Sequence, residues 1–170
     1  MIRYIALLRA VNVGGTGNLP MADLRAICED SGFARVKTYI ASGNVVFETK
    51  IAASKVRSEM EARLLAHLGK PVGVVVRTAS EMHDVLKANP FPDAEPNRTY
   101  AIFLNHSPPR DALDHVTGRS NEMMVLGDRE IFVFYPGGMG RSKLKIPAAK
   151  TGTARNMNTV ARLTEIAAKP

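Results

Sequence analysis

The residues near the amino terminus that could bind an anion follow the first apolar segment. Arg9 is followed by Asn12-Val13-Gly14-Gly15-Thr16-Gly17-Asn18, and Pro20 begins a helical pattern. Glycines let a ligand approach the backbone, and free N–H groups at a helix start favour negative charge. The loop lacks the Gly-Lys-Ser/Thr of a P-loop and the spacing of a dinucleotide fingerprint. We therefore predict an anion site that includes Arg9, Asn12, Gly14 and Gly15, with a simple strand-to-helix turn as the alternative.

A second polar group lies at a predicted bend between two strands. Ser42 and Asn44 flank Gly43 and could present a hydroxyl and an amide to a ligand. The flanking Gly-x-Ser-x-Gly of a nucleophile elbow is missing, so the residues do not indicate nucleophilic catalysis. The alternative is an ordinary turn.

The carboxy-terminal part of the chain is strongly basic. Residues 141–170 hold seven basic side chains and one acid, a net charge of +6, whereas the first 140 residues carry +1. This asymmetry favours an anionic partner, although a solvated surface that aids solubility is the alternative. Thr153 is expected to cap the last helix, which would place Arg155 in its first turn. A cation there is unfavourable unless an anion binds nearby.

These segments together predict one anion-binding site shared by the two halves of the chain. The ligand would be a phosphate-bearing small molecule, a nucleotide or a nucleic acid. The expected contacts are Arg9, Asn12, Gly14, Gly15, Ser42, Asn44, Lys143, Arg155, Asn156 and Asn158. Two alternatives stay open. One is a non-catalytic module that binds nucleic acid through the basic carboxy-terminal third. The other is an enzyme that acts on a phosphorylated small molecule, for which no sequence feature names a general base.

Several other kinds of site are not expected. The four histidines are scattered without metal-ligand spacing and Cys28 is the single cysteine, so neither a zinc site nor an internal disulfide is predicted. No cofactor is identified, and the oligomeric state is left open. The apolar runs are too short to cross a bilayer, and the first residues lack the pattern of a signal peptide. We therefore expect a cytoplasmic protein with no membrane partner.

Hydrophobic spacing predicts the elements that would position these residues in the first half. Apolar runs predict strands, and apolar positions three or four residues apart predict helices. The strands are expected over 3–13, 36–41, 45–49 and 72–77, and the helices over 21–31 and 52–68. This βαββαβ order is typical of the split βαβ arrangement of ferredoxin-like folds. Apolar residues make up 45% of the chain, enough for a real core.

The second half partly repeats that order after a linking helix over 80–88. Strands are expected over 99–105, 122–126 and 130–135, and helices over 109–116 and 156–168. The predicted fold class is therefore α+β, with two tandem ferredoxin-like subdomains at 1–78 and 79–170. The second is expected to lack its final strand and to end in a helix.

Five segments together resemble a bacterial protein family known as domain of unknown function 1697. They are ALLRAVNVGG at 6–15 followed by Leu19-Pro20-Met21, TYIASGNVVF at 38–47, Asn89-Pro90-Phe91, Gly140-Arg141-Ser142-Lys143-Leu144, and TARNMNTV at 153–160. They follow the family's order and span nearly the whole chain. The resemblance implies an α+β fold of ferredoxin-like subdomains and no established activity. It also implies a tryptophan where Met157 stands, so an aromatic ring that could stack on a ligand is missing here.

Overall fold

The computed structural model describes residues 1–13 and 18–169, and these form two compact units. The first unit comprises Met1–His83 together with the residues from Leu163 onward, and the second comprises Asp84–Arg162. Each unit contains its own four-stranded antiparallel sheet, so the α+β class is confirmed. The predicted boundary after residue 78 stays a prediction, since helix α3 (Ala79–Lys87) contributes residues to both units.

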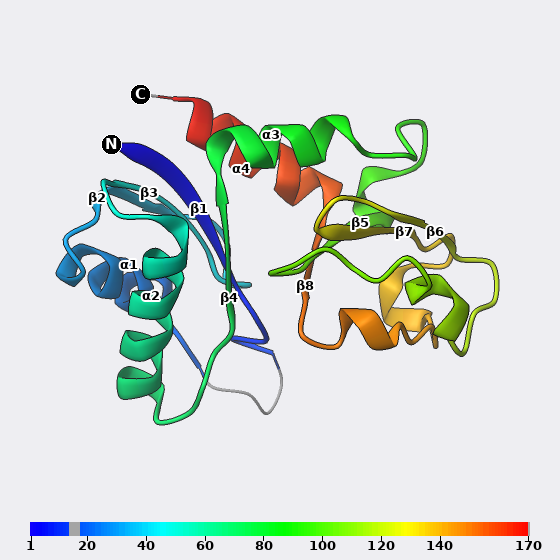
Figure 1. Cartoon of the computed structure of the whole chain (residues 1–170), viewed down its shortest axis with the longest axis horizontal. Coiled ribbons are helices and arrows are strands. Elements are labelled where there is room, and N and C mark those ends of the chain that lie inside the picture. Colours follow the sequence, from blue (N-terminus) through cyan, green and yellow to red (C-terminus); the bar gives the residue numbers. More distant parts are fainter. Residues whose placement is uncertain (14–17, 170) are drawn as a thin grey trace. The chain divides into compact units, whose positions relative to one another are not determined.

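The first unit places two helices on one face of its sheet. Its elements are β1 (Ile2–Leu8), α1 (Met21–Asp30), β2 (Ala34–Thr38), β3 (Asn44–Thr49), α2 (Ala53–Leu68) and β4 (Val74–Thr78). The strand order is β2-β3-β1-β4, with every neighbouring pair antiparallel. Figure 1 shows α1 and α2 lying side by side against that sheet.

The core of the first unit follows from the side-chain periods of its strands and helices. Alternate residues of β1 point to one face, so Tyr4 and Leu8 pack among the residues of α1 and α2. On α2 the fully buried Met60 and Leu64 are four residues apart, the spacing of one helical face. Phe47 of β3 stacks on Phe33 with ring centroids 4.5 Å apart. The helix-covered face of the sheet is therefore the main apolar core of this unit.

The first strand is shorter than the sequence predicts. It ends at Leu8, because Ala10 (φ 55) and Asn12 (φ 56) adopt left-handed conformations that do not fit a strand. The prediction that Arg9 lies within the strand was therefore wrong. Arg9 follows the strand at the edge of the loop, where its charge is exposed to solvent.

The second unit repeats the strand order without long helices between the strands. Its elements are β5 (Thr99–Phe103), η2 (Ala112–His115), β6 (Met123–Leu126), β7 (Glu130–Phe134), η3 (Met139–Arg141), η4 (Pro147–Ala149) and β8 (Thr153–Asn156), followed by α4 (Met157–Ala168). A short 3-10 turn, η1 (Pro96–Arg98), precedes β5. The sheet order is β6-β7-β5-β8, again with antiparallel neighbours.

Two predictions for the second half were wrong. The half does not lack its final strand, because β8 pairs with β5 and places Arg155 opposite Ala101. The sequence Thr-Ala-Arg-Asn is too short and too polar to be recognised as a strand, and only pairing with β5 makes it one. The helix expected over 109–116 is only a 3-10 helix, η2, which begins after Pro109 and Asp111.

Loop and 3-10 residues cover one face of the second sheet. The buried residues Ile102, Ile131 and Val133 form its core, and Leu113 of η2 and Ile146 pack against them. A 3-10 turn covers less of a sheet than a long helix does, so connecting segments must supply the remaining contacts. Within the described residues, no helix combines the length and the apolar character that a membrane span requires.

Candidate functional site

The structure brings several amino-terminal candidates to one end of the first sheet. The N–H of Leu8 donates to the carbonyl of Gly43 at 2.8 Å, and the N–H of Arg9 donates to the carbonyl of Gly73 at 2.9 Å. The end of β1, the β2–β3 turn and the residues before β4 therefore lie together. Arg9, Asn12, Ser42 and Asn44 belong to these segments, whereas Gly14 and Gly15 lie outside the described residues.

Asn12 uses its side chain to hold the two ends of its loop. Its amide donates to the carbonyls of Leu19 at 2.7 Å and Ala41 at 2.8 Å. Its carbonyl oxygen accepts from the N–H of Leu19 at 2.6 Å. These three hydrogen bonds join Asn12 to Leu19 and to the β2–β3 turn, so the side chain has a clear structural role.

Asn44 holds the β2–β3 turn in a similar way. It is fully buried, and its amide donates to the carbonyl of Tyr39 at 2.8 Å and to the hydroxyl of Ser42 at 2.9 Å. Gly43 has φ +90, and a Cβ there would lie 2.9 Å from the Cβ of Leu8. This turn is therefore tightly packed, and glycine is required for both its backbone conformation and its space.

Arg9 lines a small cavity beside a second cation. The cavity has a volume of about 140 Å³, and Lys70 and Gly73 also line it. The aliphatic part of Arg9 runs along Gly73, where a Cβ would lie 3.7 Å from the Cβ of Arg9. Two cationic side chains at one cavity favour a small anion, the chemistry that the sequence predicted for Arg9.

The carboxy-terminal candidates have different environments. Arg155 lies in β8 and is only 6% exposed, and its guanidinium donates to the hydroxyl of Thr153 at 2.6 Å and to the carbonyl of Ala154 at 2.9 Å. Burial lowers the pKa of Arg155 to about 10. Asn158 is exposed on α4.

The cap of the last helix differs from the prediction. Thr153 lies in β8, four residues before α4, and so does not cap that helix. Asn156 takes this role, because its side-chain oxygen accepts from the N–H of Thr159 at 3.0 Å. Arg155 consequently lies in the strand rather than in the first helical turn, so it is not an unfavourable cation at the helix start.

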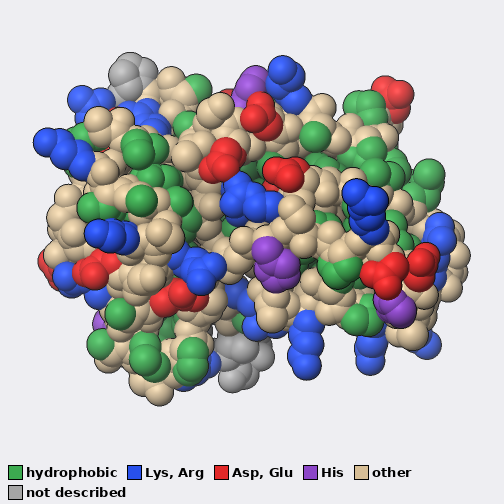
Figure 2. All heavy atoms as spheres, viewed as in Figure 1, with side chains coloured by type: hydrophobic (Ala, Val, Ile, Leu, Met, Phe, Trp, Pro, Cys, Tyr) green, Lys and Arg blue, Asp and Glu red, His purple; other side chains and the backbone are tan. Residues whose placement is uncertain are grey.

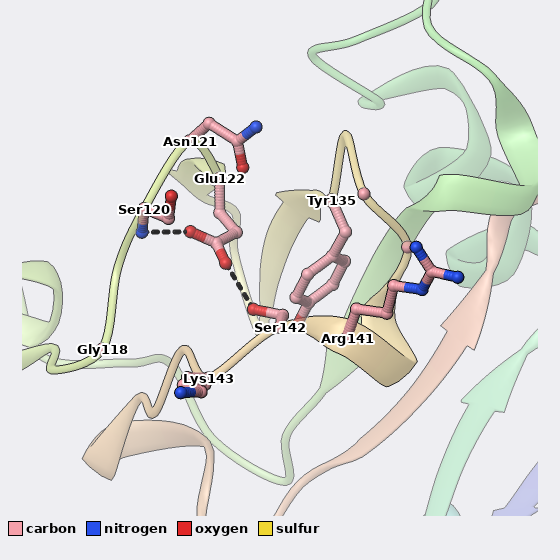
Figure 3. Close-up of a pocket in the computed structure, with 10 residues that line it drawn as sticks. Gly118, Ser120, Asn121, Glu122, Tyr135, Arg141, Ser142 and Lys143 are labelled. Carbon is pink, nitrogen blue, oxygen red and sulfur yellow. Dashed lines mark hydrogen bonds between the residues drawn. The ribbon is translucent and has the colours of Figure 1, made fainter.

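Lys143 lines a cavity of about 220 Å³ in the second unit (Figure 3). Two chain segments form it, one before β6 and one after β7, and the second begins with Tyr135. The lining residues are Gly118, Ser120, Asn121, Glu122, Tyr135, Gly137, Gly138, Arg141, Ser142 and Lys143. Arg155, Asn156 and Asn158 are not among them.

Glu122 is the most tightly held polar side chain of this cavity. The residue is 4% exposed, and Oε1 accepts from the backbone N–H of Ser120 at 2.6 Å. Oε2 accepts from the hydroxyl of Ser142, as the dashed lines in Figure 3 show. The hydrogen bond from Ser142 and those from the backbone, with the charge of Arg119, hold the pKa of Glu122 below its usual range. Glu122 is therefore a carboxylate at neutral pH.

Tyr135 forms the other side of the cavity, across from Glu122 (Figure 3). It is 7% exposed, and its ring packs edge-on against Tyr100 with centroids 5.5 Å apart. Burial, with the charges of Glu122 and Tyr100, raises the pKa of Tyr135 to about 12. Its hydroxyl is therefore protonated at neutral pH and can both donate and accept a hydrogen bond.

Two exposed cations that line the cavity flank Ser142 in the chain. Arg141 and Lys143 precede and follow it, while the hydroxyl of Ser142 also accepts from the N–H of Leu144 at 3.1 Å. The two hydrogen bonds of Ser142 hold the backbone of this segment in place, and the side chains of Arg141 and Lys143 extend from that backbone. The lowered pKa of Glu122 makes it a weak base for Ser142. The arrangement therefore suits binding better than proton abstraction.

Of the residues that line this cavity, only Lys143 was among the contacts predicted from the sequence. Arg141 and Ser142 belong to a segment that carried the family resemblance, but they were not selected as contacts. Glu122 was missed because it is 20 residues from Ser142 in sequence and stands at the predicted start of a strand. The polar run Arg119-Ser120-Asn121 before it was the available signal. Within the described part of the chain, no group of His, Cys, Asp or Glu could hold a metal ion.

The fold and the cavity define an α+β protein with two antiparallel sheets and a polar cavity in the second unit. A family model described as "Protein of unknown function (DUF1697)" matches residues 1–132, and the chain belongs to this family. The family resemblance noted in the sequence is thereby confirmed.

A comparison with solved structures finds the conserved bacterial protein SP0830 from Streptococcus pneumoniae, with a TM-score of 0.80 and 22% identity over 98% of each chain. This likeness concerns the fold. The search of curated proteins found no match.

Proposed function

We propose that this protein binds a small phosphate-bearing molecule, and that the cavity of the second unit is a binding site for it. The observation that carries the proposal is the pair of exposed cations, Arg141 and Lys143, on either side of the anchored Ser142. Arginine and lysine form strong charge-assisted hydrogen bonds with phosphate oxygens. A fixed backbone lowers the ordering cost when these side chains close on a ligand.

The first unit offers cations of its own at Arg9 and Lys70. The prediction of one site shared by both halves stays a prediction, as do the contacts expected from Arg155, Asn156 and Asn158. An enzyme that acts on a phosphorylated small molecule is the catalytic form of the same proposal. It would need a general base other than Glu122, whose pKa is lowered.

We also infer that each unit is a variant of the ferredoxin-like arrangement. The βαββαβ order of the first unit and the matching strand orders of the two sheets support this inference. In the second unit, 3-10 turns and loops would then stand in place of the two long helices.

A thermal-shift screen tests the binding proposal. A phosphorylated metabolite at a hundredfold excess over its Kd should stabilise the folded protein by about 2.7 kcal/mol, while its dephosphorylated form should not. The Lys143→Ala variant should lose most of this stabilisation. Lys145→Ala is the matched control, because Lys145 is exposed two residues further on and does not line the cavity. Equal loss in both variants, or no stabilisation by any phosphate, would contradict the proposal.

A second candidate function, nucleic-acid binding, is favoured by a basic groove in the first unit. The groove has a volume of about 500 Å³. Its cationic members are Arg3, Arg25, Arg35, Lys37 and Lys169. Several of these cations are partly neutralised, since Arg3 and Arg35 pair with Glu48 and Arg25 pairs with Glu29.

On the face that Figure 2 shows, acidic side chains lie among the basic ones. If nucleic acid binds through the groove, affinity for a short oligonucleotide should fall steeply with salt, and Lys37→Ala should weaken it at low salt. Affinity for a mononucleotide that equals the affinity for the oligonucleotide would instead favour the small-molecule proposal.

A further inference from the structure

The cavity of the second unit is lined by a buried carboxylate and by two exposed cations. The carboxylate of Glu122 lies beside the hydroxyl of Ser142, and the ring of Tyr135 also lines the cavity (Figure 3). Arg141 and Lys143 are exposed on either side of Ser142 along the chain, and their side chains point in different directions in Figure 3. A carboxylate repels a bare anion, so Glu122 restricts which ligands fit this cavity.

Glu122 can recognise a hydrogen-bond donor. Each of its oxygens accepts one intramolecular hydrogen bond, from Ser120 and from Ser142. A carboxylate oxygen can accept more than one, and an ionised carboxylate only accepts. A group that binds here must therefore donate an O–H or N–H. A bare phosphate dianion carries no such donor and would be repelled by the carboxylate charge.

Tyr135 adds a surface for the carbon skeleton of a ligand. Its ring lines the cavity across from Glu122, and the edge-on packing against Tyr100 holds it in place. An aromatic ring offers an apolar face, and the protonated phenol offers a hydroxyl. Carbon-bound hydrogens could pack on the ring while hydroxyl groups reach Glu122.

The walls of the cavity are held together by the backbone. Thr117 and Lys145 exchange two hydrogen bonds, of 3.0 Å and 2.8 Å. Gly118 approaches Lys143 so closely that a Cβ would lie 2.0 Å from the carbonyl oxygen of Lys143. The segment that carries Glu122 and the segment that carries the cations are thus fixed to each other. Such a preformed site selects ligands by the separation of their polar groups.

We propose that the cavity is selective for a hydroxylated phosphate monoester, a sugar phosphate, with its hydroxyl groups at Glu122 and its phosphate at Lys143. This inference rests on the proposed function and names the class of ligand for the same site. The volume of about 220 Å³ lies below the ~300–1,000 Å³ of typical drug-sized pockets, so one sugar ring fits better than a dinucleotide.

Calorimetric titration with three probes tests this selectivity. The probes are ribose 5-phosphate, methyl phosphate, which carries the same charge without carbon-bound hydroxyls, and ribose, which carries the hydroxyls without the charge. The unaltered protein should bind ribose 5-phosphate at least tenfold more tightly than methyl phosphate. Lys143→Ala should weaken both phosphates, and ribose alone should bind weakest.

The results separate the two proposals. If both phosphates bind equally tightly and both need Lys143, the sugar-phosphate inference fails and the anion proposal stands. If no phosphate binds, or ribose binds as tightly as its phosphate, the anion proposal fails. The first titration uses the unaltered protein, so the outcome does not depend on the folding of any variant.

A variant of the carboxylate gives a second, independent readout. Glu122→Gln keeps the shape of the side chain and removes its charge, so the tenfold preference for ribose 5-phosphate should shrink to less than threefold. Asp128→Asn is the matched control, because Asp128 is exposed in the β6–β7 turn and does not line the cavity. It should keep the full preference. An unchanged preference in Glu122→Gln would overturn the role assigned to the carboxylate.

Discussion

The two units form sheets with the same strand order but differ in the segments that connect and cover the strands. The order β2-β3-β1-β4 of the first corresponds to β6-β7-β5-β8 of the second. The registers also correspond, because Arg77 lies opposite the residue that follows Tyr4, and Arg155 lies opposite the residue that follows Tyr100. Both arginines are buried, at 1% and 6% exposure. The sheets therefore share a strand order and an edge strand with a buried arginine.

The difference lies in what connects the strands. In the first unit, α1 and α2 cover one face, and Asn12 and Asn44 hold the backbone of the connecting turns. In the second unit, 3-10 turns and loops cover the sheet, and their polar side chains line a cavity that includes Glu122 and Lys143. The long helices of the first unit bury apolar side chains against the sheet, whereas the loops of the second unit place polar side chains around a cavity. Substitutions of buried residues under the helices of the first unit should therefore cost mainly stability, and substitutions of the exposed cations at the cavity should cost mainly binding.

The largest effect is expected in the helix-covered core. Phe47→Ala removes a fully buried ring that stacks on Phe33, and it should reduce the free energy of unfolding by about 3–5 kcal/mol. Met123→Ala is the control, because Met123 is 50% exposed in β6 and should change the free energy by less than about 0.5 kcal/mol. Urea denaturation at neutral pH measures both. A loss below 1 kcal/mol for Phe47→Ala would mean that the core argument is wrong.

Two glycines with nearly the same positive φ distinguish backbone strain from close packing. Gly69 ends α2 with φ +73 and has no neighbour within 4 Å of a Cβ, whereas Gly118 has φ +69 and faces the carbonyl of Lys143. Gly69→Ala should cost about 1–2 kcal/mol from the left-handed conformation. Gly118→Ala should cost a further ~1–3 kcal/mol, because the two cavity segments must separate. Equal losses on urea denaturation would show that the close approach at Gly118 contributes nothing.

Polar substitutions in the two units sharpen the comparison. Asn44→Ala removes a fully buried amide that donates to the carbonyl of Tyr39 and should cost about 1–3 kcal/mol. Lys143→Ala removes an exposed side chain and should change the free energy of unfolding by less than about 0.5 kcal/mol. The same denaturation curves give both values. If Lys143→Ala is the more destabilising of the two, the buried amide of Asn44 does not stabilise the fold more than the exposed cation does, and the comparison of the two units is wrong.

The smallest effect concerns the acid range. The pKa of Glu122 is lowered in the folded protein, so the unfolded chain takes up its proton first as pH falls. The stabilisation is complete above the ordinary value of about 4.3 and is lost as pH falls through the lowered value. Glu122→Gln should therefore lower the melting temperature at pH 7 and have less effect at pH 3. A melting-temperature difference that is the same at both pH values would contradict this assignment.

Much of the fold could be predicted from the sequence because local patterns determine it. The spacing of Val56, Met60 and Leu64 predicts α2, and Gly69 marks its end. Strand β8 could not be predicted, because Thr-Ala-Arg-Asn has no apolar alternation and becomes a strand only by pairing with β5. The burial of Arg155 follows from that pairing, and so no local signal indicates it.

The candidate site was harder to predict from the sequence than the fold. Glycine, cationic and amide residues indicated where polar groups gather, and this led to Lys143 and Arg9. The sequence could not distinguish a side chain that meets a ligand from one that holds the backbone, as Asn12 does. Glu122 and Ser142 meet only after β6 and β7 have paired, so their hydrogen bond depends on tertiary structure.

The central claim is that the cavity of the second unit binds a phosphate-bearing ligand. Backbone amide resonances recorded by NMR during titration with ribose 5-phosphate test it most directly. We predict saturable shifts at Ser120–Glu122 and at Gly137–Lys143, and their loss in Lys143→Ala but not in Lys145→Ala. Saturable binding that leaves those two segments unshifted, with changes confined to the residues around Arg9 and Lys70, would contradict the claim.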